Sequence, residues 1–294
     1  MRALCVGLIT VGLLGLSGCS TPRLAYEGLP YLLQWEAQRT WSLDDQQADF
    51  TRQRIGVLLE WHRREQLRPL ANWLQSVRQQ LREAPPPSAE TIGQWRESAE
   101  QWWQPVAERL APDLVRLAET LTPAQRARMR GRIDDANARW RRDIHPPSAR
   151  MRASRREERL VERVEWLMGE INSAQRETIR EYVREASVFD ALIEAERMGK
   201  QTRLLGALDS VEPGELAAAA RASAELRFAA TLERLWRPDP ARIDQANRFA
   251  LANDALFAKL FALASTSQRS ALDRHLAGWI EDLNTLANRS AKRG

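Results

Sequence analysis

Apolar residues recur at intervals of three and four along most of the chain. From residue 44 onward the first of these positions are 50, 57, 58, 61, 67, 70, 74, 77 and 81, with Arg, Glu and Gln between them. The same interval returns over 179–193, 216–235 and 272–286. This spacing is typical of amphipathic helices, and no stretch alternates apolar and polar residues as a strand would. The sequence therefore predicts an all-α protein, built as an elongated multi-helix bundle.

Prolines indicate where these helices bend or end. Pro69 lacks the backbone donor that a helix interior needs, so it should kink or split the helix predicted over 44–84. The proline run at 85–87 should end that helix. His145-Pro-Pro-Ser is the sharpest later break, because the residue before a proline avoids the helical region. We expect two helical halves, 43–145 and 146–294, which meet at an elbow or hinge within one continuous α-helical domain.

A repeated helix start is the most informative internal feature. Three segments place Leu or Ile before a capping residue and Gln three residues after it, and a fourth has Ala in the first place. The cap oxygen can accept from the backbone N–H of that Gln, while the Gln side chain reaches back to the N–H of the cap. The predicted N-caps are Asp44, Thr122, Asn172 and Ser265.

The first nineteen residues have the form of a secretory signal. Arg2 precedes an apolar run over 3–16 that is too short to cross a membrane as a helix. Small residues that end in a cysteine follow, in the order Leu16, Ser17, Gly18 and Cys19. This order resembles the lipobox of bacterial lipoproteins. The resemblance implies a signal peptide over 1–18, a diacylated Cys19 thiol and an acylated new amino terminus; cleavage at Gly18 that leaves a free cysteine is the alternative.

Residues 19–42 would then form the lipidated amino terminus and a tether. Ser20 follows the cysteine, whereas aspartate there is the familiar signal for retention in the inner membrane. The resemblance thus favours the outer membrane, with the protein facing the periplasm. The tether carries four aromatic residues, Tyr26, Tyr31, Trp35 and Trp41. They suit a membrane interface or packing under the first long helix, and we favour packing because the neighbouring leucines also need burial.

Cysteine content and charge narrow the possible chemistry. The chain has two cysteines, of which Cys5 leaves with the signal peptide, so disulfides, cysteine nucleophiles and zinc–thiolate sites are excluded from the lipidated protein. The formal net charge is only +5. With a periplasmic address, this modest charge argues against nucleic acid as a partner and leaves lipid headgroups and acidic proteins.

The basic residues gather in one region. Residues 126–163 hold 13 arginines against six acidic residues, on both sides of the predicted elbow. This run predicts a cationic surface for lipid phosphates, lipopolysaccharide or an acidic partner; a solvated, salt-bridged helical hairpin is the favoured alternative. The arginines of the candidate surface are Arg139, Arg141, Arg142, Arg150, Arg152, Arg155 and Arg156.

Catalytic and metal-binding patterns are not found in the sequence. There is no nucleophile elbow after the signal, no glycine-rich phosphate loop and no His-Glu-x-x-His. The three histidines, His62, His145 and His275, fall on separate segments. We therefore expect no catalytic residue, no metal and no cofactor apart from the covalent lipid on Cys19. His62 is expected at the border of a packed face beside Trp61.

Two resemblances follow from these motifs. The lipobox, Arg-Leu-Ala-Tyr at 23–26, the helix start at 43–47 and Trp61-His62-Arg63 resemble an uncharacterised family of proteobacterial lipoproteins, defined only as a domain of unknown function. Leu-Thr-Pro-Ala-Gln at 121–125 is similar to the motif of the Spy and CpxP periplasmic proteins, among which Spy is an ATP-independent chaperone. Only this copy matches strictly, and those proteins are shorter and carry no lipid anchor.

These observations favour a non-enzymatic role in the bacterial envelope. We expect a lipid-anchored protein that binds a protein partner or supports envelope integrity. The alternative is a Spy-like chaperone, in which some of the eleven tryptophans would form an exposed cradle for unfolded clients.

Overall fold

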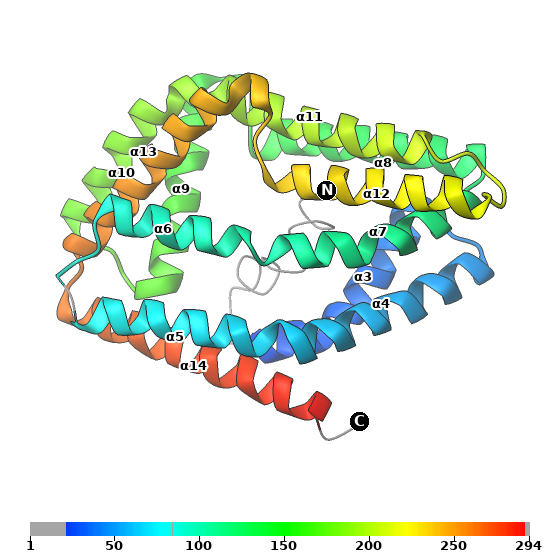
Figure 1. Cartoon of the computed structure of the whole chain (residues 1–294). Coiled ribbons are helices and arrows are strands. Elements are labelled where there is room, and N and C mark those ends of the chain that lie inside the picture. The colour runs from blue at the N-terminus through cyan, green and yellow to red at the C-terminus, as the bar shows by residue number, and fades with distance from the viewer. Residues whose placement is uncertain (1–21, 84, 292–294) are drawn as a thin grey trace.

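The computed structural model describes residues 22–83 and 85–291 and consists of helices joined by short connections (Figure 1). The first six helices are α3 (Pro22–Trp41), α4 (Asp45–Glu65), α5 (Leu67–Glu83), α6 (Ala89–Glu100), α7 (Trp103–Thr120) and α8 (Pro123–Asp143). The next elements are α9 (Ala149–Met168), α10 (Ser173–Glu185), the 3₁₀ turn η1 (Ala186–Phe189) and α11 (Asp190–Asp209). The last are α12 (Ala218–Trp236), η2 (Pro240–Arg242), α13 (Ile243–Ala262) and α14 (Thr266–Ala291). These ranges contain no strand, and the all-α prediction is confirmed.

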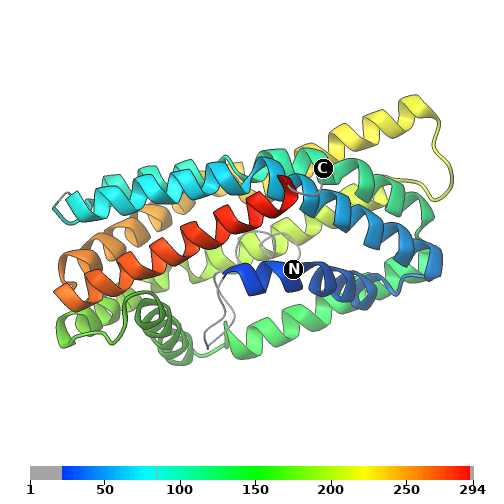
Figure 2. The same cartoon turned by 90° about the horizontal axis from the view of Figure 1, so that it is seen from below.

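Helices that are distant in sequence lie side by side. α12 packs along α7, α14 along α5 and α13 along α6. In Figure 1, α5 and α14 form the lower edge, α8, α11 and α12 the upper edge, and α9, α10 and α13 one end. The underside, seen in Figure 2, brings α3 and α8 next to each other.

The core does not follow the predicted division at 145/146. One cluster of buried side chains joins α3, α4, α7 and α8 to α12 and the end of α11. A second joins α9, α10 and α13 to the first half of α14, and a third joins α5 to its second half. The range 146–294 therefore contributes to all three clusters: α12 buries Phe228 and Leu232 against α7 in the first, and α14 takes part in the other two.

The structure has a helix start at each of the four predicted caps. The cap side chain accepts the backbone N–H of the glutamine three residues on in every copy. The glutamine Oε1 in turn accepts the N–H of the cap, at 2.9–3.0 Å. The caps are Asp44, Thr122, Asn172 and Ser265.

These helix starts are also paired across the chain. Gln47 and Gln125, at the starts of α4 and α8, exchange two hydrogen bonds between Nε2 and Oε1, of 3.2 and 2.6 Å. At the starts of α10 and α14, Gln268 Nε2 donates to Gln175 Oε1 at 2.9 Å. All four side chains are buried. We call these two contacts the amide clasps.

Two segments near the amino terminus bear on the sequence prediction. The predicted split of the helix over 44–84 is confirmed; the break lies at Gln66, three residues before Pro69, so that the proline falls in the first turn of α5, where its missing donor costs little. The described part of the predicted tether is helix α3, and the packing favoured for it is confirmed at Trp41, whereas Tyr31 and Trp35 are exposed. Leu29, Leu33 and Trp41 recur on one side of α3 and are buried, so packing against the core stabilises this helix despite Gly28 and Pro30.

Over 22–83 and 85–291, no single helix is both long enough and apolar enough to cross a membrane. One bent pair of segments, Ala218–Ala262 with Thr266–Arg289, meets both conditions, by length and composition alone, with 117° between the two parts.

Candidate binding cleft

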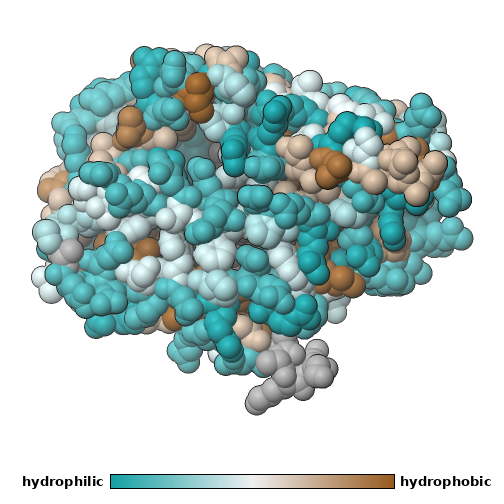
Figure 3. Space-filling view, viewed as in Figure 1, coloured by the Kyte–Doolittle hydropathy of each residue, from teal (hydrophilic) through white to brown (hydrophobic). Residues whose placement is uncertain are grey.

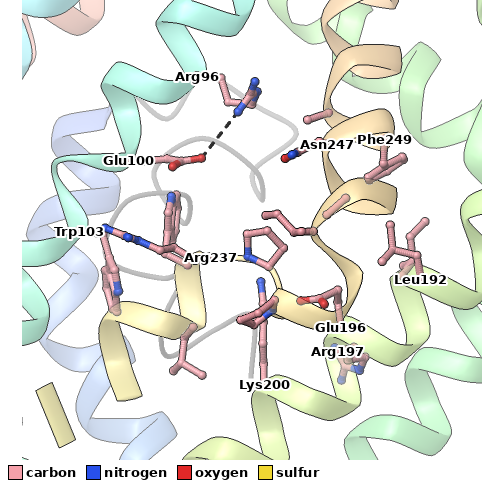
Figure 4. A pocket seen from close by; sticks show the side chains of 18 of the residues that line it. Arg96, Glu100, Trp103, Leu192, Glu196, Arg197, Lys200, Arg237, Asn247 and Phe249 are labelled. Carbon is pink, nitrogen blue, oxygen red and sulfur yellow. Dashed lines mark ion pairs between the residues drawn. The ribbon is translucent and has the colours of Figure 1, made fainter. Parts of the chain in front are cut away.

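An open cleft lies where α6, α7, α11, α12 and α13 converge. Its volume is about 950 Å³, within the range of ligand-binding pockets. Figure 3 shows the surface hollowed between α6 and the connection from α12 to α13. Figure 4 shows Arg96 and Glu100 reaching into it from α6, Asn247 and Phe249 from α13, and Lys200 from α11. The cleft is thus built from helices that are far apart in sequence, with lining residues that run from Arg96 to Ala250.

Stacked tryptophans form one wall. Trp103, the first residue of α7, is almost fully buried, and its Nε1 donates to the Leu232 carbonyl at 2.7 Å. Trp236, the last residue of α12, stacks on it with ring centroids 6.0 Å apart. The buried ring therefore holds the half-exposed ring of Trp236 in place, and Trp236 presents a fixed aromatic face to the cleft.

A polar network fixes the wall made by α8 and α11. The side chains of Asn137 and Gln201 exchange hydrogen bonds of 2.7 and 2.8 Å, and both are buried. Arg197 donates to Asn137 at 3.0 Å, which places its guanidinium 5.1 Å from the centroid of the Trp140 ring. Since each amide is satisfied inside the protein, this network positions the arginine and does not depend on a ligand.

An ion pair closes the end formed by α6 and α13. Asp254 is buried, and its carboxylate lies 3.1 Å from Arg96 Nη2. Arg96 also lies 3.7 Å from Glu100. Gly93, one turn earlier, lets α13 approach closely, since a Cβ there would lie 3.2 Å from the Asp254 carboxylate. The pair therefore joins the two helices and leaves mixed charge at the rim.

The lining combines apolar side chains with charges of both signs. Part-exposed apolar side chains of Ile193, Trp236, Ile243 and Phe249 face the space, together with Pro238 and Pro240. Four basic residues and three glutamates also line it. The described lining includes no Ser, Thr, Cys or His. Apolar faces with charges of both signs at the edge are typical of a surface that accepts a polypeptide segment.

The predicted cationic surface is mostly neutralised. Arg141 pairs with Glu194 at 2.8 Å, Arg142 with Asp143 at 3.0 Å and Arg155 with Glu158 at 3.1 Å. These three arginines stay exposed, as do Arg139 and Arg150, which have no ion pair among the described residues.

Placing Arg152 and Arg156 on that surface is wrong. Both are largely buried and pair with the carboxylate of Asp190 at the start of α11, Arg152 at 2.5 Å. Arg152 also donates to the carbonyls of Pro146 and Pro147. Burial opposes ionisation of Asp190, but hydrogen bonds from the two arginines outweigh it and hold the pKa of this carboxyl below its ordinary value. A buried carboxylate needs cations beside it, so the elbow directs these arginines inward.

His62 is buried and does not lie at the border of a packed face. Its Nδ1 lies 3.0 Å from the Tyr26 hydroxyl, which also donates to the Leu59 carbonyl. Burial lowers the pKa of His62 to about 4, and the charge of Arg63 acts in the same direction. No group of three or more His, Cys, Asp or Glu side chains in the described part of the chain is placed to hold a metal ion.

Leu16, Ser17, Gly18 and Cys19 lie outside the described residues. The sequence does not predict the cleft, because its walls come from helices that are distant in sequence and whose packing the local pattern of residues does not indicate. The only local signal was Trp236-Arg-Pro-Asp-Pro, an aromatic residue next to a turn that cannot be helical.

Comparison with known proteins gives a family. No curated protein matches the chain, and no solved structure does. A family model matches residues 41–239, more than half of the chain, and covers α4 to α12 with most of the cleft. The chain belongs to DUF6279, a family of unknown function.

Proposed function

We propose that this protein is a lipid-anchored envelope protein that faces the periplasm and binds a segment of a partner protein in its cleft. The cleft is the observation that carries the proposal. It is large enough for several side chains of an extended segment, and its aromatic wall is held by contacts inside the protein. The role is non-enzymatic, in keeping with a lining of rings, aliphatic side chains and salt-bridged charges.

The anchor rests on the lipobox. Acylation at Cys19 would hold the helical body at the outer membrane. The variant Cys19→Ser should leave the membrane fraction and appear in the soluble periplasmic fraction at a similar total amount. Retention of this variant in the membrane fraction would contradict the anchor.

Site-specific photocrosslinking in cells tests the cleft. A photoreactive residue at Ile243, which lines the cleft and is 41% exposed, should give one or two discrete adducts. The same residue at Leu251, on the same helix, 62% exposed and outside the cleft lining, is the matched control and should give none. Adding Trp236→Ser should abolish the Ile243 adducts. Equal adducts from both positions would overturn the proposal.

A Spy-like chaperone is the competing outcome of this test. It would give many weak adducts at Ile243, and the purified protein would suppress aggregation of two unrelated unfolding clients. The structure supports this alternative less, because of the eleven tryptophans only Trp35 and Trp166 are exposed. These two tryptophans lie on different helices, α3 and α9.

A further inference from the structure

Helix α3 has two apolar faces, only one of which is covered. Leu29, Leu33, Ala37 and Trp41 pack into the core. On another side, Leu24, Tyr31, Leu32 and Trp35 are 59%, 79%, 40% and 58% exposed. Leu24, Tyr31 and Trp35 are spaced seven and four residues apart, which places them on one face of the helix, and Leu32 lies beside Tyr31. These four residues form one band along the helix, which we call the α3 stripe.

We propose that the α3 stripe lies in the headgroup region of the membrane that holds the anchor, so that α3 is an interfacial helix. This inference rests on the proposed lipid anchor. Cys19 precedes Pro22 by three residues, so its Cα lies at most about 11 Å from the start of α3. Acyl chains on Cys19 would place the start of the helix at the bilayer surface. No second partner can approach this short segment as readily as the lipids around its own anchor.

The composition of the α3 stripe fits the headgroup region of a membrane. Tyrosine and tryptophan combine an apolar body with a polar tip and are enriched where acyl chains meet headgroups. The Arg39 guanidinium lies 5.0 Å from the centroid of the Trp35 ring and also pairs with Glu36 at 2.7 Å, so it is held at the edge of the stripe beside the ring. An aliphatic stripe would fit a protein core equally well, whereas this aromatic one with an adjacent arginine favours the interface.

Charge on the neighbouring helix supports the same occupant. α8 packs beside α3 (Figure 2), and Trp41 Nε1 lies 2.9 Å from the Met129 sulfur. Arg128, Arg132 and Arg139 of α8 are exposed and have no ion pair among the described residues. Basic residues beside an inserted aromatic helix are typical of surfaces that bind anionic lipid. These exposed arginines of α8 would thus bind lipid phosphates.

Two measurements on the full chain test the inference. In the first, the acylated protein is placed in vesicles of phosphatidylethanolamine with a minor share of phosphatidylglycerol that carry brominated acyl chains, and quenching of tryptophan emission is recorded. Trp35→Phe, which removes the reporter and keeps the stripe apolar, should lose the quenched component. Trp166→Phe, which removes the other exposed tryptophan, should keep it.

In the second, the unacylated Cys19→Ser chain is mixed with the same vesicles without bromine. Tyr31→Ser/Trp35→Ser should lower its partitioning about tenfold. Val188→Ser/Leu226→Ser is the control, since it changes two comparably exposed apolar residues elsewhere and should leave partitioning unchanged. Both variants should keep the far-UV circular dichroism of the parent, because all four side chains are exposed.

The outcomes separate the stripe from the anchor. If the acylated chain is membrane-bound but Trp35 is not quenched, the inference is overturned and the anchor stands. If Cys19 is not acylated in cells yet the stripe still mediates partitioning, the anchor is contradicted, and the interfacial position of α3 stands on the stripe alone. A concentration-dependent dimer that Tyr31→Ser/Trp35→Ser abolishes, without partitioning, would overturn the inference in favour of a second copy as the occupant.

Discussion

Gln175 is wholly buried, and its side-chain amide connects three parts of the chain. Oε1 accepts from the Asn172 backbone and from Gln268, while Nε2 donates to the Leu260 carbonyl. At the scale of single residues, buried side-chain amides satisfy backbone N–H and carbonyl groups that an apolar side chain at the same position would leave without partners.

Gln175→Ala should therefore destabilise the protein. The change leaves buried donors and acceptors without partners, and we expect the free energy of unfolding to fall by about 3 kcal/mol. Urea unfolding measures this. Gln75→Ala, at an exposed position of α5, is the control and should change the free energy of unfolding by less than about 0.5 kcal/mol. Equal effects of the two changes would contradict the role of the clasp.

His62 gives stability a pH dependence. The unfolded chain takes up this proton near pH 6.5, whereas burial lowers the pKa in the folded protein to about 4. The unfolded state thus binds more protons between these values, so the free energy of unfolding should fall as pH drops from about 6.5 to 4, by on the order of 3 kcal/mol. Urea unfolding at several pH values should show this slope in the wild type and lose it in His62→Gln. The same slope in both would show that His62 is not the group responsible.

At the scale of elements, the predictable features are local ones. Each helix start combines a cap, a glutamine and a preceding buried residue within five positions, so the sequence alone indicates where α4, α8, α10 and α14 begin. The clasps join positions 78 and 93 residues apart, and nothing in the local pattern selects those partners. The same reason explains the error at Arg152 and Arg156, because their orientation depends on Asp190, which is more than 30 residues away.

The elbow between α8 and α9 should depend on Asp190. Asp190→Asn leaves two largely buried arginines without their carboxylate, and we expect a loss of about 3 kcal/mol in the free energy of unfolding. Asp143→Asn removes an exposed carboxylate at the same elbow, where its pair with Arg142 is worth little. A similar loss in both variants, measured by urea unfolding, would refute this assignment.

At the scale of the whole molecule, shared helices connect the three clusters of buried side chains. α14 contributes to the second and third clusters, and α11 to the first and second. Arg289 of α14 also lies 2.5 Å from Glu27 of α3, which joins the two ends of the described chain. The sequence predicted the class of fold but not this closure, since it depends on which faces of distant helices meet.

Such sharing predicts one cooperative unfolding transition. Urea transitions followed by far-UV circular dichroism and by tryptophan fluorescence should coincide in their midpoints. A fragment of residues 146–294 should fail to fold alone, because α12 would lack α7 and the second half of α14 would lack α5. Two separated transitions, or a folded fragment, would restore the division at the elbow.

The amide clasps have a consequence for how the family can vary. Each clasp fixes the position and orientation of two helix starts relative to each other. One extra residue inside α7 would turn α8 by about 100° relative to α4 and break the contact between Gln47 and Gln125. Changes in chain length are thereby confined to connections such as 210–217, which lie between clasped starts but can absorb an added residue without rotating a helix. We expect relatives to differ in length in these connections and to keep the number of residues in each helix that leads to a clasped start.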